Sequence, residues 1–529
     1  MYSAAVAAPA SFDRRQLLYA SYVLVVLTIV YLFNFIDRQL PSILAERIKD
    51  SMSVSDAELG YLYGTVFTVF YAIFGIPLGR LADVWNRRSL VALGLGAWSL
   101  MTAASGLSRN FAELTAARIG VGIGEASATP AAYSMLSDYF PASMRATAIS
   151  LYSSGVYLGS GLALFVGGRV VRYWDETYPA GSAPWDLSGW QATFILVGLP
   201  GVLMALWVRT LREPVRSQAD GMVTPPHPHP FREFGRELRA VLPGLTVWNL
   251  AVLGGARSVR NNLLILVGIA LVAFGLVQAT GDTAQWVALG VGSYAAASWV
   301  QSLRLRDPAS FALIFGTPTL RYLVPAVSLL AFSGYGVGFW TPAYLIRTHG
   351  VDEARVGDFL LFTTAIGGFL GVALGGILGD LWRTREPRGR LILLAGAAIA
   401  AVPAGLAMIY APDIETALWL TFPSNILGSM WIGVGAGTLQ DLMLPRMRAV
   451  ASAAYLLSIT FIGLALGPYM IGRISVTADL RLGMTVGLCV NVVAFVAAIL
   501  AARSLVADES SLRARARAAG EDVAERDGR

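Results

Sequence analysis

Long apolar segments recur throughout this 529-residue chain and constrain its fold more than any other feature. About 20 apolar residues suffice for a helix to cross a bilayer, and only helices or closed barrels can satisfy their backbone polar groups there. Fourteen such segments occur, at 19–47, 58–80, 90–107, 112–135, 147–168, 190–208, 262–280, 284–303, 320–345, 357–380, 391–410, 416–439, 449–472 and 482–504. The sequence therefore predicts an all-α polytopic membrane protein with fourteen transmembrane helices.

The spacing of these segments divides the chain into six, two and six spans. We predict five parts: an N-terminal tail, a six-helix half, a cytoplasmic linker with two inserted helices, a second six-helix half and a C-terminal tail, at 1–18, 19–208, 209–319, 320–504 and 505–529. The segment 241–255 is apolar but too short to span, so we interpret it as an interfacial helix. The tail after Asp508 alternates in charge without an apolar face, which predicts a solvated or disordered segment.

Charge and composition indicate how the chain is oriented. Hydrophobic residues make up 55% of it and charged residues 14%, and the net charge of +6 comes from arginines, since Lys49 is the only lysine. These arginines lie between apolar segments on one predicted side, a pattern that sets membrane topology and does not indicate nucleic-acid binding. We expect both termini to be cytoplasmic, the protein to be monomeric in the cell's inner (plasma) membrane, and no metal or cofactor to be required.

The two six-helix halves resemble each other in sequence. Five residues near the second span recur 297 positions later: Val54, Ala57, Gly60, Gly79 and Asp83 become Val351, Ala354, Gly357, Gly376 and Asp380. A second group recurs after 303 positions: Asp138, Arg145, Ala146, Ala148 and Tyr152 become Asp441, Arg448, Ala449, Ala451 and Tyr455. Two ordered matches predict an internal duplication, the arrangement of transporters whose substrate site lies between two repeats.

Ionisable residues interrupt two of the predicted spans. The first span contains F-N-F-I-D-R-Q-L-P over 33–41, which places Asp37 and Arg38 near the bilayer midplane. Such residues cost at least ~2.5 kcal/mol each at that depth and mark functional pathways or buried partners. In the fourth span Arg118 and Glu125 are seven residues apart and share one helix face. Glycines at 120, 122 and 124 predict that a neighbouring helix approaches this one closely.

Three motifs resemble those of a known family. G-R-L-A-D over 79–83 with Arg87 and Arg88 resembles the loop between helices two and three of the major facilitator superfamily, with departures at Val84 and Asn86. F-N-F-I-D-R, R-I-G-V-G-I-G-E-A-S and L-S-D-Y-F-P followed by Arg145 resemble the Spinster branch. The resemblance covers both halves but not the inserted region 209–310. It implies the fold of that superfamily and a cytoplasmic gate involving Asp83, Arg87, Arg88, Asp138, Arg145 and Asp380. The alternative is that the loop charges only cap helices and set topology.

Helices one and four are neighbours in that fold, so the resemblance implies one cluster of Asp37, Arg38, Arg118 and Glu125. Because the histidines lie outside the spans, Asp37 and Glu125 remain as the membrane-embedded proton carriers. We expect Arg38, Arg118 and Asn34 to bind a substrate headgroup or to pair with these carboxylates. The alternative is a static salt-bridge network that holds the two helices together.

Two further patterns allow a functional and a purely structural interpretation. In the second half, aromatic, polar and soft apolar residues could line a cavity for a lipid tail or simply pack: Phe332, Tyr335, Phe339, Trp340, Asn425 and Met430. Small residues recur every four positions in two spans, at 155, 159, 163 and 167 and at 367, 371, 375 and 379. Such ladders could form a sliding surface between the halves or pack tightly within one half.

Together these features predict a secondary transporter. Spinster proteins transport sphingolipids and lysophospholipids, some with protons, so the resemblance implies an amphiphilic lipid with a charged headgroup. A small organic anion is the alternative, because two arginines also suit a carboxylate or phosphate. A membrane-embedded enzyme or receptor is disfavoured, since the sequence has no metal-ligand cluster, nucleophile elbow or phosphate-binding loop in a suitable context.

Overall fold

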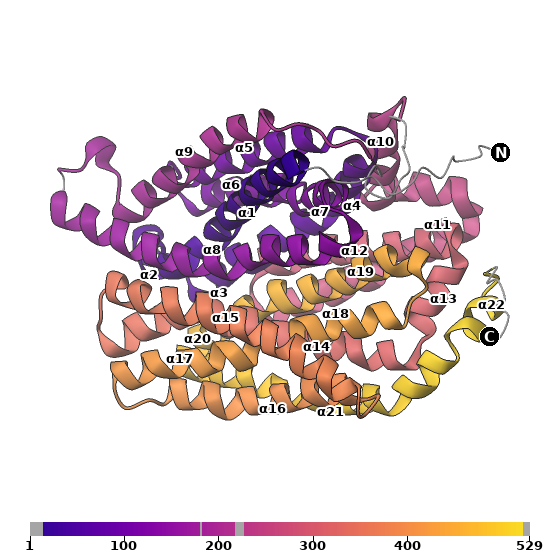
Figure 1. Ribbon diagram of the computed structural model, residues 1–529. Helices are drawn as coiled ribbons and strands as arrows, with labels where there is room; N and C mark the ends of the chain where they lie inside the picture. Colours follow the sequence, from indigo (N-terminus) through magenta and orange to yellow (C-terminus); the bar gives the residue numbers. More distant parts are fainter. Residues whose placement is uncertain (1–13, 180–181, 217–226, 522–529) are drawn as a thin grey trace. The chain divides into compact units, whose positions relative to one another are not determined.

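The computed structural model of the chain describes residues 14–179, 182–216 and 227–521, and the regular elements in these ranges are helices (Figure 1). Ten helices in the described ranges are long and apolar enough to cross a membrane. Four predicted spans lie outside this set. Residues 90–107 and 284–303 fall in α5 and α12, and 112–135 and 416–439 each form two shorter helices. The all-helical class is thus confirmed, while the count of fourteen spans stays a prediction.

The helices group into two compact units. Unit 1 comprises residues 1–54, 70–238 and 350–365, and unit 2 comprises 55–69, 239–349 and 366–529. The elements of unit 1, of which α4 begins and α10 ends in unit 2, are α1 (Arg14–Ile43), α2 (Ala45–Met52), α4 (Phe67–Val84), α5 (Arg87–Ser105), α6 (Phe111–Glu125), α7 (Ala128–Tyr139), α8 (Ala142–Thr177), the short 3-10 turn η2 (Pro184–Asp186), α9 (Gly189–Arg209) and α10 (Pro230–Val241).

Unit 2 contains the inserted helices and most of the second predicted half. Its elements, of which α15 begins in unit 1, are α3 (Asp56–Gly60), the π-helix η1 (Tyr61–Val66), α11 (Leu245–Thr280), α12 (Thr283–Arg306), α13 (Pro308–Gly316), α14 (Pro318–His349), α15 (Glu353–Arg383), α16 (Gly389–Ile409), α17 (Ile414–Ser429), α18 (Trp431–Asp441), η4 (Pro445–Met447), α19 (Arg448–Ser458), the π-helix η5 (Ile459–Ala465), α20 (Leu466–Thr477), α21 (Leu480–Ser510) and α22 (Leu512–Ala518).

Each unit includes a short segment from the opposite predicted half. Residues 55–69 begin the second span of the first half but belong to unit 2, and residues 350–365 begin the second span of the second half but belong to unit 1. The chain passes from one unit to the other inside continuous helices: α3, η1 and α4 form one span over Asp56–Val84, and α15 runs over Glu353–Arg383. These two segments therefore make most of their contacts with helices far away in sequence.

The inserted region forms a helical hairpin in unit 2. Predicted interfacial segment 241–255 supplies the start of α11, and Gly255, with φ 63°, breaks the helix there. A polar seam joins α11 to α12: Tyr294 donates to Asn262 Oδ1 at 2.6 Å, and Asn262 Nδ2 donates to Ser298 Oγ at 3.0 Å. At the hairpin turn, Tyr469 of α20 donates to Asp282 at 2.7 Å, and its ring packs edge-on against Trp286.

Among the described residues, α10, α13 and α22 lie wholly outside the predicted spans. The linker contains α10, whose Phe231 ring lies 5.3 Å from that of Trp85 and whose Glu233 accepts from Arg80 at 3.3 Å. The tail, predicted to be solvated or disordered, is helical over much of its described part and therefore not disordered there. There α22 follows α21, Arg515 donates to Thr317 at 2.5 Å, and Glu521 accepts from Arg446. These contacts order a charged segment that has no apolar face of its own.

Each glycine ladder packs against a helix of its own predicted half. A Cβ at Gly159 would lie 2.5 Å from the carbonyl oxygen of Leu32 in α1, and one at Gly371 would lie 2.2 Å from that of Ile426 in α17. Gly155 and Gly167 likewise face α1, and Gly375 faces Met430. The ladders therefore bring helix backbones together inside each half, which is the second of the two interpretations above.

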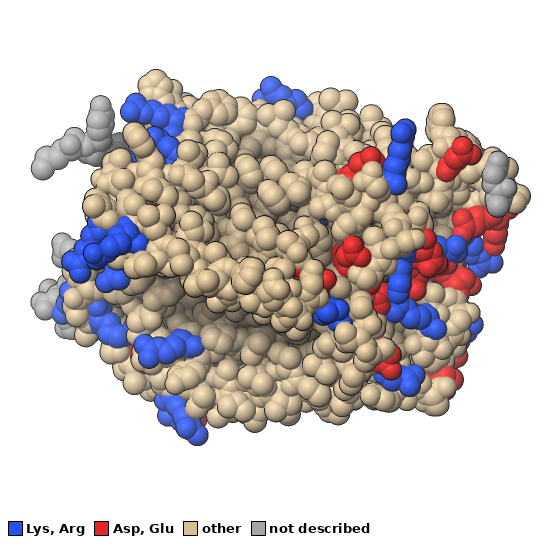
Figure 2. Space-filling view, turned by 180° about the vertical axis from the view of Figure 1, so that it is seen from behind, with Lys and Arg blue, Asp and Glu red and all other residues tan. Residues whose placement is uncertain are grey.

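On the face shown in Figure 2, charged side chains lie mainly toward two edges, and the area between them is almost free of charge. One edge shows almost only Lys and Arg, whereas the other mixes basic and acidic residues. This distribution is typical of a membrane protein whose hydrocarbon-facing belt is apolar.

Candidate functional site

The proline of the first span determines where its polar residues can bind. Pro41 lies inside α1 and has no N–H, so the carbonyl of Asp37, four residues earlier, lacks its helical partner. Arg118 of α6 supplies the missing donor, because its Nη2 donates to the Asp37 carbonyl oxygen at 3.2 Å. Both residues are buried, each with 2% of its surface exposed. The contact joins the first and fourth predicted spans through the backbone carbonyl of Asp37.

Arg38 and Glu125 form the direct ion pair of the site. Arg38 Nε donates to Glu125 Oε2 at 2.7 Å, and the Glu125 side chain is fully buried. The Arg38 guanidinium carbon also lies 5.1 Å from the ring centre of Phe35 and 4.7 Å from that of Tyr71. Rings at these distances attract a cation and fix the plane of the guanidinium. Tyr71 of α4 was not among the predicted site residues, since nothing in its own span sets it apart.

A helix break positions Glu125. Helix α6 ends at this residue and α7 begins three positions later, with Pro130 in its first turn, where a missing N–H costs nothing. The carboxylate thus lies at a helix C-terminus, where the helix dipole disfavours negative charge, so the Arg38 cation is an essential partner. A neighbouring helix approaches Gly120 and Gly124 closely, as predicted, and it is α5: a Cβ on either glycine would meet Met101 or Trp98 of that helix. The glycine face of α6 therefore packs against α5.

Three acceptor atoms in this cluster have no hydrogen-bond partner among the described residues. They are Asn34 Oδ1, Asp37 Oδ1 and Glu125 Oε1, and all three residues are buried. A buried acceptor without a donor costs about 1 to 3 kcal/mol or more. A proton on either carboxylate, or a donor group of a bound molecule, would remove this cost. The site is therefore suited to taking up protons or a polar headgroup.

The apolar residues predicted to line a cavity all lie in unit 2. Phe339 and Trp340 are buried in packing contacts: the Phe339 ring stacks on Tyr63 at 4.3 Å, and Trp340 Nε1 donates to the Pro468 carbonyl at 2.8 Å. Tyr335 is 37% exposed, Phe332 and Asn425 are partly exposed, and Met430 is buried. A role in a cavity stays a prediction for these residues.

Two first-half residues of the predicted cytoplasmic gate, Arg87 and Asp138, belong to one network. Arg87 is fully buried and donates to Asp138, to Glu213 at 2.8 Å and to Ser134 Oγ at 2.8 Å. Arg88 donates to the Leu211 carbonyl at 2.7 Å, and Arg145 lies in the first turn of α8. Asp83 stands apart: its side chain is 63% exposed, and the nearest arginine nitrogen, Arg80 Nη1, is 4.0 Å away.

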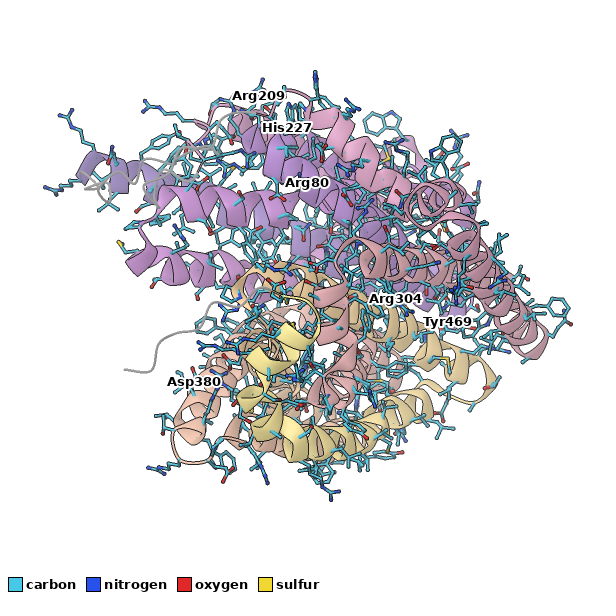
Figure 3. The ribbon with its side chains drawn as sticks, turned by 90° about the vertical axis from the view of Figure 1, so that its right-hand side faces the viewer. Arg80, Arg209, His227, Arg304, Asp380 and Tyr469 are labelled. Carbon is cyan, nitrogen blue, oxygen red and sulfur yellow. The ribbon has the colours of Figure 1, made fainter. Side chains whose placement is uncertain are left out.

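The second half has a matching network at the ends of α15, α16 and α18. Asp380 accepts from Arg390 Nε at 2.9 Å, and Asp441 accepts from both Arg390 and Arg383. Asp441 is the repeat counterpart of Asp138, so each half pairs this aspartate with an arginine at the start of its third helix. In Figure 3 the label of Arg80 falls on the helices of unit 1 and that of Asp380 on those of unit 2.

The linker contributes charges that sequence analysis did not assign. Glu213 accepts from the Arg87 side chain and, at 2.9 Å, from the Arg88 backbone. Arg216 Nη2 donates to the carbonyl of Ala82 at 2.8 Å and also to that of Trp85, which caps the end of α4. The signal for these contacts is only that the linker carries charges beside a charged loop, and a sequence alone cannot pair them.

The chain resembles membrane transporters along most of its length. Residues 27–468 match the Major Facilitator Superfamily. An "MFS-type efflux pump" of Mycolicibacterium smegmatis is 26% identical over 451 residues, which is 85% of this chain and 83% of that protein. Human "Protein spinster homolog 1" is 24% identical over 472 residues, 86% of this chain and 72% of that protein.

A solved structure is similar in fold and in sequence. It is a bacterial homologue of the human lysosomal transporter Spinster in an inward-facing, unoccupied conformation. The similarity covers 93% of this chain and 98% of that one, with 26% sequence identity and a TM-score of 0.69. The match therefore extends over nearly the whole chain rather than over a single motif.

Proposed function

The chain belongs to the major facilitator superfamily and is Spinster-like, and on this basis we propose that it is a proton-linked secondary transporter that moves an amphiphilic lipid by alternating access. The observation that carries the proposal is the buried Arg38–Glu125 pair next to Asp37, with both acids retaining an unpartnered oxygen. An ionisable cluster at this depth is costly unless it is used. Lysophospholipids and sphingoid lipids are the proposed cargo, following the family resemblance.

Competition for Arg38 would couple lipid to protons. An ionised Glu125 holds the guanidinium through a charge-assisted hydrogen bond. Protonation of Glu125 removes this attraction, so Arg38 can bind an anionic headgroup instead. Headgroup binding and protonation then favour one another, as any two linked equilibria must. Asp37 would act as a second proton carrier and Arg118 as a second cation, with Asn34 as a polar contact to the headgroup.

The remaining predicted residues complete the proposal. Phe332, Tyr335, Asn425 and Met430 would contact the lipid tail, and Tyr335 is 37% exposed. The charge networks around Arg87 and Arg390 would brace the cytoplasmic ends of the helices while the two halves rock. In this scheme Asp83, which has an exposed carboxylate, would find its main partner in another conformation.

A small organic anion is the alternative cargo. The arginines at the site would bind a carboxylate or a phosphate in either case, because the guanidinium geometry suits both anions. The two proposals differ in whether an apolar tail is needed. Flux of tailless anions is therefore part of the same experiment.

Flux into proteoliposomes tests the proposal. We expect labelled lysophospholipid or sphingoid lipid to move faster under an inward proton gradient, and Glu125→Gln to remove this acceleration. Glu113→Gln is the matched control, because Glu113 lies exposed in the first turn of the same helix. If neither the proton gradient nor Glu125→Gln changed the rate of lipid flux, proton coupling at Glu125 would be excluded. Movement of small anions without lipid would replace the proposed cargo.

A further inference from the structure

Two buried acids occupy equivalent places in the two halves. Asp56 is the first residue of α3 and Glu353 is the first residue of α15, 297 positions later, which is the offset of the first repeat match. Only 3% of Asp56 and 6% of Glu353 is exposed. A carboxylate in the first turn of a helix is favoured by the helix dipole, but burial at this level also requires a cation.

Each acid is paired with an arginine from the opposite half. Arg347, at the end of α14, binds Asp56 through two hydrogen bonds of 2.8 and 3.1 Å. Arg47, in α2, binds Glu353 through two hydrogen bonds of 2.7 and 3.4 Å. Arg347 lies 300 positions after Arg47, so the arginines are repeat counterparts as well. The two bonds are reciprocal: each half gives its arginine to the other half's acid.

The backbone packing around the two ion pairs is equivalent too. A Cβ at Gly472 would lie 2.3 Å from the Asp56 carbonyl oxygen, and one at Gly168 would lie 2.3 Å from that of Glu353. The next turn repeats the contact, since Gly60 meets Pro468 at 2.5 Å and Gly357 meets Leu164 at 2.3 Å. These glycines are distinct from the ladders that pack within a half. Two close cross-half helix contacts therefore each enclose one ion pair.

A second arginine of each half shows where the symmetry ends. Arg169 binds Asp358 with an Nε distance of 2.8 Å. Its counterpart 304 positions later, Arg473, has no acid of the opposite half at the matching place, because Tyr61 stands there. Arg473 instead lies 3.3 Å from Asp282 and donates to the Thr280 carbonyl at 2.8 Å, both in the turn of the inserted hairpin. Figure 3 shows Tyr469, a neighbour in this contact, beside the hairpin helices. The hairpin thus supplies the anchor that the second copy lacks.

The helices that carry the two acids change unit shortly after the ion pairs. The span that starts at Asp56 passes from unit 2 to unit 1 after residue 69, just beyond the π-helix η1, and α15 passes from unit 1 to unit 2 after residue 365. A π-helix locally weakens the regular ladder of helical hydrogen bonds and is found mostly at functional places. Each acid therefore lies on a short outer segment that is packed against the opposite half and is continuous with its own half.

We propose that the pairs Asp56–Arg347 and Glu353–Arg47 form a double latch that holds the transporter closed on the side opposite its termini. Both pairs lie in the connections between the first and second helices of a half, so the topology places them on the same side of the membrane. When the halves separate on that side, both bonds break together, because each joins one half to the other. The proposal rests on alternating access alone and is independent of the cargo and of proton coupling.

Thiol labelling tests the latch without any substrate. The reporter is Thr65→Cys, made in a Cys489→Ser background so that it is the only cysteine. Thr65 is fully buried and donates to the Ala465 carbonyl at 3.0 Å, in the cross-half contact of unit 2. In nanodiscs, Arg347→Glu and Arg47→Glu should each speed the reaction with a polar maleimide at least about threefold, by shifting the population toward the open state.

The reporter distinguishes a latch from local damage because Arg47 belongs to unit 1 and Thr65 to unit 2. The swap Arg347→Asp with Asp56→Arg, and the swap Arg47→Glu with Glu353→Arg, should return labelling to within about twofold of the parent. The control is Glu176→Arg, which breaks a pair inside α8, Arg172–Glu176 at 2.8 Å, and should leave labelling unchanged. The proposal would be overturned if Arg47→Glu left the labelling rate at position 65 unchanged, or if neither swap returned that rate to the parent value. Loss of lipid flux would leave it untouched.

Discussion

Arg38 and Pro41 show how single residues determine the geometry of the candidate site. Pro41 removes one helical hydrogen bond and thereby exposes the Asp37 carbonyl to Arg118. Arg38 is held by one carboxylate and two aromatic rings. The site therefore combines the Arg38 cation, which binds a carboxylate, with a missing helical hydrogen bond at Pro41, which orients Arg118. Each feature can be tested by a conservative substitution.

We predict that Arg38→Lys keeps the positive charge but lowers initial lipid flux by about tenfold, because lysine cannot stack its planar group on Phe35 and Tyr71. The control is Arg212→Lys, which removes the same kind of stacking on Tyr19 at the end of a helix, 4.9 Å from the ring centre. Equal flux for Arg38→Lys and the unmodified protein would show that charge alone suffices at this position.

Arg87 is the residue whose loss should most weaken the fold of unit 1. It is fully buried and binds two acids whose side chains are 11% and 24% exposed, so Arg87→Ala leaves two partly buried carboxylates without their cation. Breaking such a network costs about 3 to 5 kcal/mol. Detergent-unfolding curves followed by tryptophan fluorescence should show a large loss for Arg87→Ala and little change for Arg172→Ala, whose pair with Glu176 is solvated. Similar losses for the two variants would contradict this assignment.

At the scale of elements, glycine faces determine which helices touch. Helix α15 uses one face, Gly367, Gly371 and Gly375, to approach α17 and α18, and another residue, Gly357, to approach α8. The same helix thus serves contacts within a half and contacts between halves. The periodicity of the glycines predicts close approach but does not identify the partner.

Two glycines of α15 provide a matched comparison. A Cβ at Gly371 would lie 2.2 Å from a backbone oxygen, whereas one at Gly376 would meet nothing within 4 Å. We predict that Gly371→Ala lowers stability by about 1 to 3 kcal/mol through overpacking. Gly376→Ala should be neutral or slightly stabilising, because alanine is the better helix former. Melting temperatures in detergent check this, and a lower value for Gly376→Ala than for Gly371→Ala would contradict it.

At the scale of the whole molecule, charge asymmetry predicts the orientation in the membrane. The loops predicted to be cytoplasmic carry most of the arginines, and the opposite loops carry fewer charges of both signs; cytoplasmic loops carry the excess of basic residues. Alkaline phosphatase fused after Tyr178 should therefore be active in a bacterial host, and the same enzyme fused after Leu211 should be inactive. The opposite pattern would reverse the assignment of both termini to the cytoplasm.

The amino-acid sequence by itself determined the class, the family and most of the helices of this protein. Hydropathy, charge and helical spacing are local properties, so they place spans and their ends without knowledge of neighbours. The sequence also singled out Arg38, Glu125, Arg118 and Asp37, because ionisable residues in apolar spans are rare. That the four form one cluster was implied by the family resemblance. The predicted family resemblance was confirmed by the match over residues 27–468.

Only the tertiary structure decided which of these groups meet. In the structure Arg38 pairs with Glu125, Arg118 binds the Asp37 carbonyl, and Tyr71 lies at the site. The glycine ladders contact helices of their own predicted half. The tertiary structure also ordered α10 and α22 through contacts with distant residues and paired Asp56 and Glu353 with arginines about 300 positions away in sequence. Such contacts depend on distances between remote parts of the chain, and no local pattern of residues encodes them.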